Sequence, residues 1–199
     1  MNIHGVLLLK EMGLPEGFIH FREFSEIPLE SLNNFGDDKN LFIMGSDNRI
    51  KITDNPYIIK RWRRINISKD EIESSSKEVD AEMEAEGIPK ENRIFSIGPC
   101  FNESNTLLQG HAFKIEDTIY IDIKKGIRGS GKDFAPDFSF EIPIINNRIM
   151  FSRIPDFEFR DYVAQICKDT LLFYEGNPYL DFALMEGGKF FYHDLSFHQ

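Results

Sequence analysis

Two aspartates near the C-terminus are the residues whose type and setting point most directly to chemistry. Asp181 and Asp194 lie in two mainly aromatic and aliphatic segments, 179–184 and 189–195, on either side of Glu186-Gly187-Gly188. A glycine-rich turn between two such segments predicts an antiparallel hairpin. Two carboxylates on one face of a hairpin repel each other unless a cation or a shared proton relieves them, and Mg²⁺ accepts one or two carboxylates together with phosphate oxygens. The hairpin therefore predicts a magnesium site; the alternative is that one carboxylate faces solvent while the other pairs with a nearby cation.

A glycine-rich basic segment gives the chain a second candidate binding site. It follows an expected strand at residues 118–123, and its basic side chains are Lys124, Lys125, Arg128 and Lys132. Basic groups suit phosphate oxygens, and glycines beside them let the backbone approach a ligand closely. The segment has the spacing neither of a P-loop nor of a dinucleotide-binding fold. It predicts phosphate contacts, with a flexible solvated loop as an equal alternative.

The most basic stretch of the chain is Lys60-Arg61-Trp62-Arg63-Arg64. Its positive charge, with the indole of Trp62 as a stacking face, would suit a nucleic acid. The whole chain, however, has 33 acidic and 23 basic residues and a net charge of -10, which repels phosphate backbones. We therefore expect a strand whose guanidinium groups balance an acidic surface, and we do not expect nucleic-acid binding.

The isolated histidines and cysteines carry little functional information. His111 and His193 lie near the two candidate sites, but a lone histidine in a strand is more often packed or solvated than a base, so neither is assigned a catalytic role. Cys100 and Cys167 are too few for a disulfide framework and have no metal-binding spacing. Redox chemistry and a zinc site are therefore not expected.

Length and composition predict one globular domain, bilobal at most. A chain of 199 residues with 41% apolar and 13% aromatic residues can bury a sizeable core. The N-terminus lacks the basic region and cleavage site of a signal peptide, and no apolar run approaches the roughly 20 residues of a membrane span. We expect a cytoplasmic protein without membrane contact.

The elements that must position these residues form a mixed architecture. Apolar periodicity and capping predict helices at residues 3–12, 28–35, 68–86 and 158–174. Extended segments before the C-terminal hairpin are expected at residues 17–21, 41–44, 49–53, 57–67, 93–97, 106–114, 118–124, 138–142 and 148–152. Because strands dominate the second half, we expect an N-terminal α/β lobe at residues 1–92 and a C-terminal antiparallel-sheet lobe at residues 93–199.

Several segments occur in an order that carries more weight than any one of them. They are residues 8–21, 109–113, 118–122 with Gly126, 135–138, 158–174, 176–178, 180–184 and 190–194. In this order they resemble the ATP-binding domain of the pyruvate phosphate dikinase and phosphoenolpyruvate synthase family. The resemblance implies an α+β, ATP-grasp-like fold of mostly antiparallel sheets with flanking helices. It also implies ATP and Mg²⁺ as cofactors.

The resemblance also assigns roles to single residues. In that family, a glutamate and a glutamine on the two closing strands bind the metal that bridges the ATP phosphates, and these positions fall on Asp181 and Asp194. The family's Arg-Ser-Ser strand would fall near Met44-Gly45-Ser46, where the arginine is missing, and Ser196 replaces an arginine after the closing strand. The glycine-rich lid of the family has no counterpart. The chain has neither a phosphohistidine domain nor a pyruvate-binding barrel, so phosphoenolpyruvate synthesis by this chain alone is not expected.

Three hypotheses follow from the sequence. The first is an Mg-nucleotide-binding protein that acts as an ATP-dependent carboxylate ligase or phosphotransferase on an unknown small-molecule or protein acceptor. Arg128 and Lys132 would then stabilise the leaving group, and the nucleotide would be bound by Lys51, Lys60, Lys124 and Lys125. The second hypothesis is a non-catalytic binding or interaction module derived from the same fold. The third is an RNA-associated protein that uses residues 60–64.

Overall fold

The chain folds into two compact units, each built on its own sheet. The computed structural model describes residues 3–28, 30–32, 41–50, 62–101, 105–126, 135–173 and 176–197. Residues 2–4 and 17–101 form the N-terminal unit, and residues 5–16 and 102–199 form the C-terminal unit. Helix α1 (Ile3–Glu11) begins in the first unit and ends in the second.

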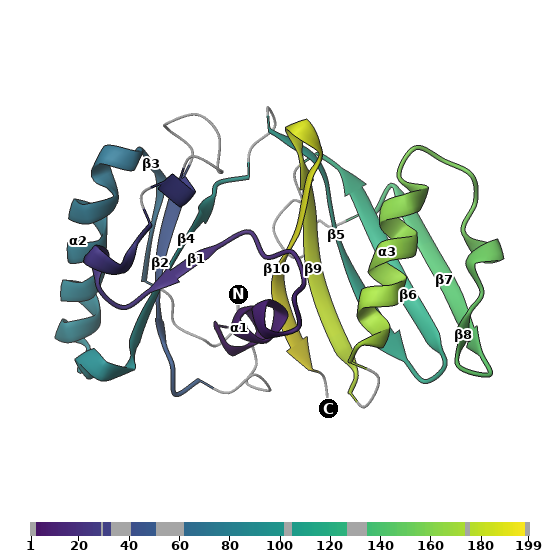
Figure 1. Cartoon of the computed structure of the whole chain (residues 1–199), viewed down its shortest axis with the longest axis horizontal. Helices are drawn as coiled ribbons and strands as arrows, with labels where there is room; N and C mark the ends of the chain where they lie inside the picture. Colours follow the sequence, from purple (N-terminus) through teal and green to yellow (C-terminus); the bar gives the residue numbers. More distant parts are fainter. Residues whose placement is uncertain are drawn as a thin grey trace. The chain divides into compact units, whose positions relative to one another are not determined.

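The N-terminal unit is a four-stranded antiparallel sheet with one helix on it (Figure 1). The strand order is β1 (Ile19–Phe21), β4 (Arg93–Pro99), β2 (Leu41–Asp47) and β3 (Trp62–Ile67). Helix α2 (Ile72–Ala85) covers one face, and the 3₁₀ turns η1 (Phe24–Glu26), η3 (Lys69–Glu71) and η4 (Lys90–Asn92) join the elements. These bounds agree with the helix expected at residues 68–86.

Local chemistry explains where α2 begins, ends and packs. The backbone N–H and the hydroxyl of Ser68 both donate to the Glu71 carboxylate at 2.8 Å, which closes the predicted capping box. Gly87, with a φ of 74°, ends the helix in a left-handed conformation. A Cβ added at Gly45 on β2 would lie 2.5 Å from the sulfur of Met83, so a glycine is needed for α2 to approach the sheet.

The C-terminal unit is a six-stranded antiparallel sheet. Its strand order is β10 (Lys189–Phe197), β9 (Pro178–Met185), β5 (Thr106–Ile115), β6 (Thr118–Lys125), β7 (Phe138–Ile145) and β8 (Arg148–Ile149). Helix α3 (Arg160–Leu171) packs on one face (Figure 1), and the 3₁₀ turns η6 (Phe151–Arg153) and η7 (Glu186–Gly188) lie between elements.

The face that α3 covers holds the core of this unit. On β6, Ile119, Ile121 and Ile123 are buried, while the residues that alternate with them are half-buried or exposed. A Cβ at Gly110 would lie 2.6 Å from the Phe182 ring, so the glycine leaves room for that ring. The sheet is therefore two-sided, with an apolar face under α3 and a second face that α3 does not cover.

The α+β class with mostly antiparallel sheets is confirmed, as are the three long helices and the C-terminal hairpin. The strand expected at residues 148–152 is wrong in part, because β8 stops at Ile149 and η6 follows. The expected lobe boundary at residue 92 needs correction as well. Strand β4 pairs with β1 and β2, so residues 93–99 belong to the N-terminal unit. Local strand texture cannot reveal this, because sheet membership depends on long-range pairing.

Candidate functional site

An irregularity in β10 sets the geometry of the two predicted metal ligands. In the first part of the hairpin, Tyr192 lies opposite Phe182; the register then shifts by one residue, and Asp194 lies opposite Asp181. Strict alternation would instead place His193 opposite Asp181 and turn Asp194 to the other face of the sheet. The extra residue of this bulge therefore brings both carboxylates to the same face, directly opposite each other.

The two aspartates are the end of a line of polar side chains that crosses five strands. Residues directly opposite one another in an antiparallel sheet point to the same face, with Cβ atoms about 4.5–5.5 Å apart. From β10 to β7, the opposed residues are Asp194, Asp181, His111, Asp122 and Ser139. We call these five residues the polar row.

The polar row lies on the face of the sheet that α3 does not cover, here called the distal face. The hydroxyl of Tyr192, on β10, donates to the Asp169 carboxylate of α3 at 2.6 Å, which fixes the α3 face. Tyr192 lies opposite Phe182, so these two side chains share the α3 face. The next pair in the register of the two strands is Asp194 opposite Asp181. Because side chains alternate, Asp181 and Asp194 point away from α3, and both are half-buried.

Hydrogen bonds fix the centre of the polar row. The Nε2 atom of His111 lies 3.1 Å from an Asp122 oxygen, and the Ser139 hydroxyl donates to the other oxygen of the same carboxylate at 2.6 Å. The His111 ring also stacks on Tyr179, with 5.1 Å between ring centroids. When the Nε2–H group of a neutral His111 donates its hydrogen bond to Asp122, the other ring nitrogen, Nδ1, carries the lone pair. The imidazole is thus oriented by a carboxylate, as in many catalytic and metal-binding histidines.

The two lysines predicted to bind nucleotide point to opposite faces. Lys124 lies opposite Gln109, two residues from Asp122 along β6, and therefore on the distal face; its ammonium donates to the Ala135 carbonyl at 3.2 Å. The Lys125 ammonium lies 3.6 Å from Glu158 and 5.7 Å from the centroids of two phenylalanine rings on the α3 face. Only Lys124 shares a face with the aspartates.

The structure thus brings together Asp181, Asp194 and Lys124 among the predicted site residues. The others lie outside the described residues: Lys51, Lys60, Arg128 and Lys132. Sequence reasoning missed the contribution of His111 and Asp122 to the same face. The signal was present, because the expected strands at 106–114 and 118–124 are joined by a short turn; in the structure β5 ends at Ile115 and β6 begins at Thr118, and this two-residue turn fixes the register that pairs His111 with Asp122.

The polar row fits a magnesium ion better than a metal held by protein alone. Within the ranges that the structure describes, no group of three or more histidine, cysteine or acidic residues is arranged to hold a metal ion. Asp181 and Asp194 offer two opposed sets of hard oxygen donors. Mg²⁺ is commonly bound by one or two carboxylates and completes its coordination with phosphate oxygens and water. The residues present therefore suit Mg²⁺ that arrives with a phosphate ligand.

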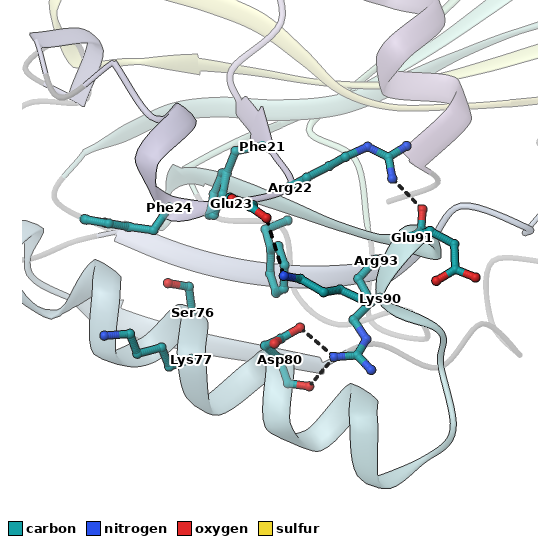
Figure 2. A pocket seen from close by; sticks show the side chains of 11 residues that line it. Phe21, Arg22, Glu23, Phe24, Ser76, Lys77, Asp80, Lys90, Glu91 and Arg93 are labelled. Carbon is teal, nitrogen blue, oxygen red and sulfur yellow. Dashed lines mark hydrogen bonds and ion pairs between the residues drawn. The ribbon is translucent and has the colours of Figure 1, made fainter.

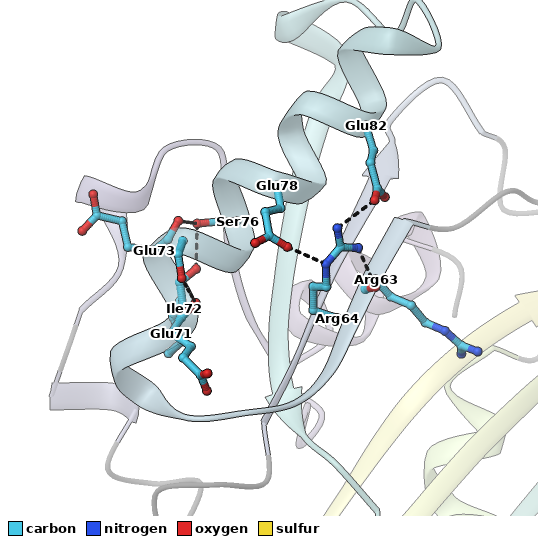
Figure 3. A network of polar contacts seen from close by, with 9 residues as sticks. Arg63, Arg64, Glu71, Ile72, Glu73, Ser76, Glu78 and Glu82 are labelled. Carbon is cyan, nitrogen blue, oxygen red and sulfur yellow. Dashed lines mark hydrogen bonds and ion pairs between the residues drawn. The ribbon is translucent and has the colours of Figure 1, made fainter.

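Within the basic stretch, Arg64 is bonded to acidic side chains of α2, as Figure 3 shows. Trp62 is only 5% exposed, and its indole N–H donates to Glu86 at 3.3 Å. The Arg64 guanidinium donates to Glu78 at 2.9 Å and to Glu82 at 2.7 Å, and these bonds raise its pKa. The indole therefore offers no stacking face, and the positive charge of Arg64 is balanced by α2. The RNA hypothesis therefore loses the stacking face of Trp62 and the charge of Arg64, while Lys60 and Arg61 lie outside the described residues.

The N-terminal unit also has a hollow of about 610 Å³ (Figure 2). Phenylalanine rings of β1, η1 and β4 line it together with charged side chains. Its charges are matched internally: Arg93 bonds to Asp80 at 2.9 Å, and Lys90 lies 3.4 Å from Glu23. Of the predicted site residues that the structure describes, none lines this hollow.

Comparison with known proteins identifies the fold. No protein-family model and no curated protein matches the chain by sequence. Among solved structures, the biotin carboxylase domain of the Hydrogenobacter thermophilus 2-oxoglutarate carboxylase aligns with 100% of this chain at a TM-score of 0.52 and 9% identity. The Coxiella burnetii D-alanine-D-alanine ligase aligns with 98% of the chain at a TM-score of 0.49 and 12% identity. The ATP-grasp ligase PsnB aligns with 98% of the chain at a TM-score of 0.46 and 13% identity.

These likenesses concern architecture. The chain covers 39%, 46% and 51% of the three solved structures, so it spans about half of their length or less. With its antiparallel sheets and flanking helices, the chain has the ATP-grasp fold. Among the described residues, no helix is both long enough and apolar enough to cross a membrane.

Proposed function

We propose that this ATP-grasp chain binds Mg-ATP on the distal face of its C-terminal unit and uses it as an ATP-dependent carboxylate ligase or phosphotransferase. The observation that carries the proposal is the bulge in β10, which places Asp194 directly opposite Asp181 on the face away from α3. A bulge that aims a carboxylate at another carboxylate is a costly arrangement for stability alone. It is a sound arrangement for holding a divalent cation.

Electrostatics supports Mg²⁺ together with a phosphate chain at this place. Like charges directly opposite each other in a sheet are destabilising, and a bound divalent cation offsets their repulsion. Lys124 adds a positive point charge to the same face, in the row beside Asp181 and His111. When bound, Mg²⁺ would neutralise phosphate charge and so favour phosphoryl transfer. The chain's own residues hold and orient the ligands.

The remaining predicted contacts stay proposals that rest on the sequence. Arg128 and Lys132 follow β6 and would stabilise negative charge on the leaving phosphate. Lys51 and Lys60 would contact the nucleotide phosphates from the N-terminal unit. Lys125 is not retained, because its side chain is on the α3 face beside Glu158. Comparable nucleotide complexes exist among the solved structures, including one with MgADP, but their identity to this chain is only 9%.

The finer resemblance to the pyruvate phosphate dikinase and phosphoenolpyruvate synthase family is also part of the proposal. Its support is the order of segments and the placement of Asp181 and Asp194 on adjacent strands. The arginine that the family has and this chain lacks would fall at Met44 on β2, and Arg63 of β3 lies directly opposite Met44. A cation is therefore present on that part of the sheet, although it comes from another strand.

The experiment is isothermal titration of the protein with ATP, with and without magnesium. We expect magnesium-dependent binding that weakens about thirtyfold in Asp181→Asn and in Asp194→Asn, because each loses one of two charged ligands. Asp161→Asn is the matched control, since it removes one carboxylate from an exposed position on α3. Equal affinity with and without magnesium, or equal losses in all three variants, would remove the proposed site.

The non-catalytic alternative makes a different prediction with the same protein. It expects Mg-ATP binding without turnover, whatever acceptor is added. A ligase or phosphotransferase forms ADP once a suitable acceptor is present, and this ADP formation requires both Asp181 and Asp194. Binding without any acceptor-stimulated ADP formation would assign the chain to the module class. Binding with stimulated ADP formation would assign it to the enzymes.

A further inference from the structure

Two further rows of side chains flank the polar row on the distal face of the C-terminal unit. On one side, Ala183, Gln109 and Lys124 lie opposite one another on β9, β5 and β6. On the other side, from β10 to β7, lie Ser196, Tyr179, Phe113, Tyr120 and Glu141. Each flanking row is one side-chain step from the polar row, so all three rows share the face. We call Tyr179, Phe113 and Tyr120 the aromatic ladder.

The aromatic ladder is regular and partly accessible. The rings of Phe113 and Tyr120 are 5.2 Å apart at an interplanar angle of 12°, and those of Phe113 and Tyr179 are 6.0 Å apart at the same angle. All three side chains are half-buried. The His111 ring lies 5.1 Å from Tyr179 at 20°, so the stack continues into the polar row. Prealigned rings of this kind favour a ligand that carries a ring of its own.

The charges of the two flanking rows differ in sign. The row on one side ends in Lys124, which attracts phosphate, whereas the aromatic ladder ends beside Glu141, which repels it. A polyphosphate is therefore favoured over the Lys124 side of the polar row. The aromatic side is left for a ligand without phosphate, and that ligand would be adjacent to Asp181 and His111. The face thus separates a place for a nucleotide from a place for its reaction partner.

We propose that the acceptor is a carboxylic acid that carries an aromatic ring. Its ring packs against the aromatic ladder, and its carboxylate reaches the polar row beside the proposed Mg²⁺, whose charge offsets the repulsion between this carboxylate and the aspartates. This inference rests on the Mg-ATP site proposed above. In the reaction, a carboxylate oxygen forms a bond to the γ-phosphorus of ATP, the bond from that phosphorus to the β,γ-bridging oxygen breaks, and ADP leaves with the electron pair. The carboxylate is ionised at neutral pH, so this step transfers no proton.

The test compares two acids that differ only in the ring. 3-Phenylpropanoate and propanoate are each titrated into the full chain by ligand-observed NMR, with magnesium present and without nucleotide. We expect 3-phenylpropanoate to bind at least about tenfold more tightly, with saturation transferred to its ring protons. Phe113→Leu and Tyr120→Leu should each remove most of this preference. Tyr162→Leu is the matched control, because that ring contacts Phe190 on the α3 face at 5.5 Å.

Each outcome separates the inference from the proposed function. The same samples are titrated with Mg-ATP, which also shows that the variants are folded. A chain that binds Mg-ATP but binds both acids equally, or keeps its preference in both ladder variants, overturns the inference alone. A chain that does not bind Mg-ATP overturns the proposed function and the inference with it.

A second pair of probes identifies the source of the ring and carboxylate. The peptide Gly-Gly-Gly-Phe presents both groups at its C-terminus, and Gly-Gly-Gly-Gly lacks the ring. Tighter binding of the phenylalanine peptide than of 3-phenylpropanoate assigns a peptide acceptor, and the reverse assigns a small acid; both support the ladder. With ATP, magnesium and hydroxylamine, the acyl phosphate is converted to a hydroxamic acid and phosphate. We expect this product at least tenfold faster from the ring-bearing probe, and equal rates would overturn the inference.

Discussion

The α2 face of the N-terminal sheet and the distal face of the C-terminal sheet treat charge in opposite ways. On the α2 face, Arg93 and Arg64 are each held by acidic side chains of the helix. On the distal face, two aspartates are opposed across neighbouring strands. Matched charges of the first kind hold a helix on a sheet. Two carboxylates opposed across neighbouring strands repel each other, and a divalent cation can bind between them.

This contrast shows why charge density in a sequence is a poor guide to a binding site. Residues 60–64 are the most basic stretch of the chain, yet Arg64 bonds to two glutamates and Trp62 is in the core. The distal face draws Asp181, Asp194 and Asp122 from three separate segments, none of which is strongly charged. Whether a charged residue can bind a ligand therefore depends on the groups that surround it in the folded chain, and not on how many charges lie near it in the sequence.

Arg93→Met should destabilise the N-terminal unit most. The Arg93 side chain is 8% exposed and donates to the Asp80 carboxylate at 2.9 Å and to the Ile88 carbonyl at 2.7 Å, so its loss removes two charge-assisted hydrogen bonds made by a buried group. We expect the free energy of unfolding to fall by about 3 kcal/mol. Trp62 is the one tryptophan of the chain, so its fluorescence in urea reports on this unit.

Arg64→Met is the control for that measurement. The Arg64 side chain is 30% exposed and its glutamate partners are 60% and 47% exposed, so solvent screens these pairs. A loss below about 1 kcal/mol is expected. Equal losses in the two variants would show that burial does not separate them and would weaken the contrast drawn here.

Tyr192→Phe should loosen α3 from the C-terminal sheet. The variant removes the hydroxyl that donates to the buried Asp169, which Gln165 also contacts at 2.7 Å, and about 1–2 kcal/mol should be lost. Cys167 on α3 is the probe, because burial raises the pKa of its thiol to about 12 and shields it from labelling reagents at pH 8.

Labelling of Cys167 in a Cys100→Ser background measures how often α3 opens. We expect Tyr192→Phe to label about five- to thirtyfold faster than the parent, in proportion to the lost stability. Unchanged labelling would mean that the hydroxyl contributes nothing to the attachment of the helix.

The sequence predicted elements better than the contacts between them. Periodicity and capping located α2 and α3 within a few residues, because the signals for a helix are local. The glycine turn located the hairpin for the same reason. The bulge at His193 could not be predicted, since it depends on which pairing register of β9 and β10 buries the more apolar side chains. Without it, Asp194 would not have been placed opposite Asp181.

The opposite faces of Lys124 and Lys125 were within reach of the sequence, and so was the membership of His111 in the site. Alternation along residues 118–124 separates the two lysines, and the short turn after residue 115 pairs His111 with Asp122. Both conclusions need a pairing between strands, which residue types alone do not supply. The assignment of residues 93–99 to the wrong lobe has the same cause.

Asp181→Asn should not destabilise the C-terminal unit, in contrast to the arginine variant. Removing one of two opposed like charges should leave the free energy of unfolding unchanged or raise it by up to about 0.5 kcal/mol. Magnesium should then distinguish the proteins. At a magnesium concentration ten times the dissociation constant, linkage stabilises the parent by about 1.4 kcal/mol and slows Cys167 labelling about tenfold, with no such effect in the variant. A variant that is strongly destabilised, or that still responds to magnesium, would show that the aspartates are structural.

The smallest effect should come from the Asp47 and Arg49 pair of the N-terminal unit, and it should depend on pH. Arg49 donates to the Asp47 carboxylate at 2.6–3.1 Å and holds the pKa of Asp47 below its ordinary value. A carboxyl group with a lower pKa in the folded chain stabilises the fold above its unfolded pKa, and this contribution is lost as the pH falls through the folded pKa.

Because the Arg49 side chain is 55% exposed, the contribution of the Asp47 and Arg49 pair to the free energy of unfolding should be under about 1 kcal/mol. The parent should therefore exceed Asp47→Asn in stability at pH 7, and the difference should shrink as the pH falls below about 4 and vanish once it lies below the folded pKa of Asp47. Other acidic groups titrate alike in both proteins and cancel, so a difference that does not shrink as the pH falls below about 4 would show that Asp47 acts through packing and not through its charge.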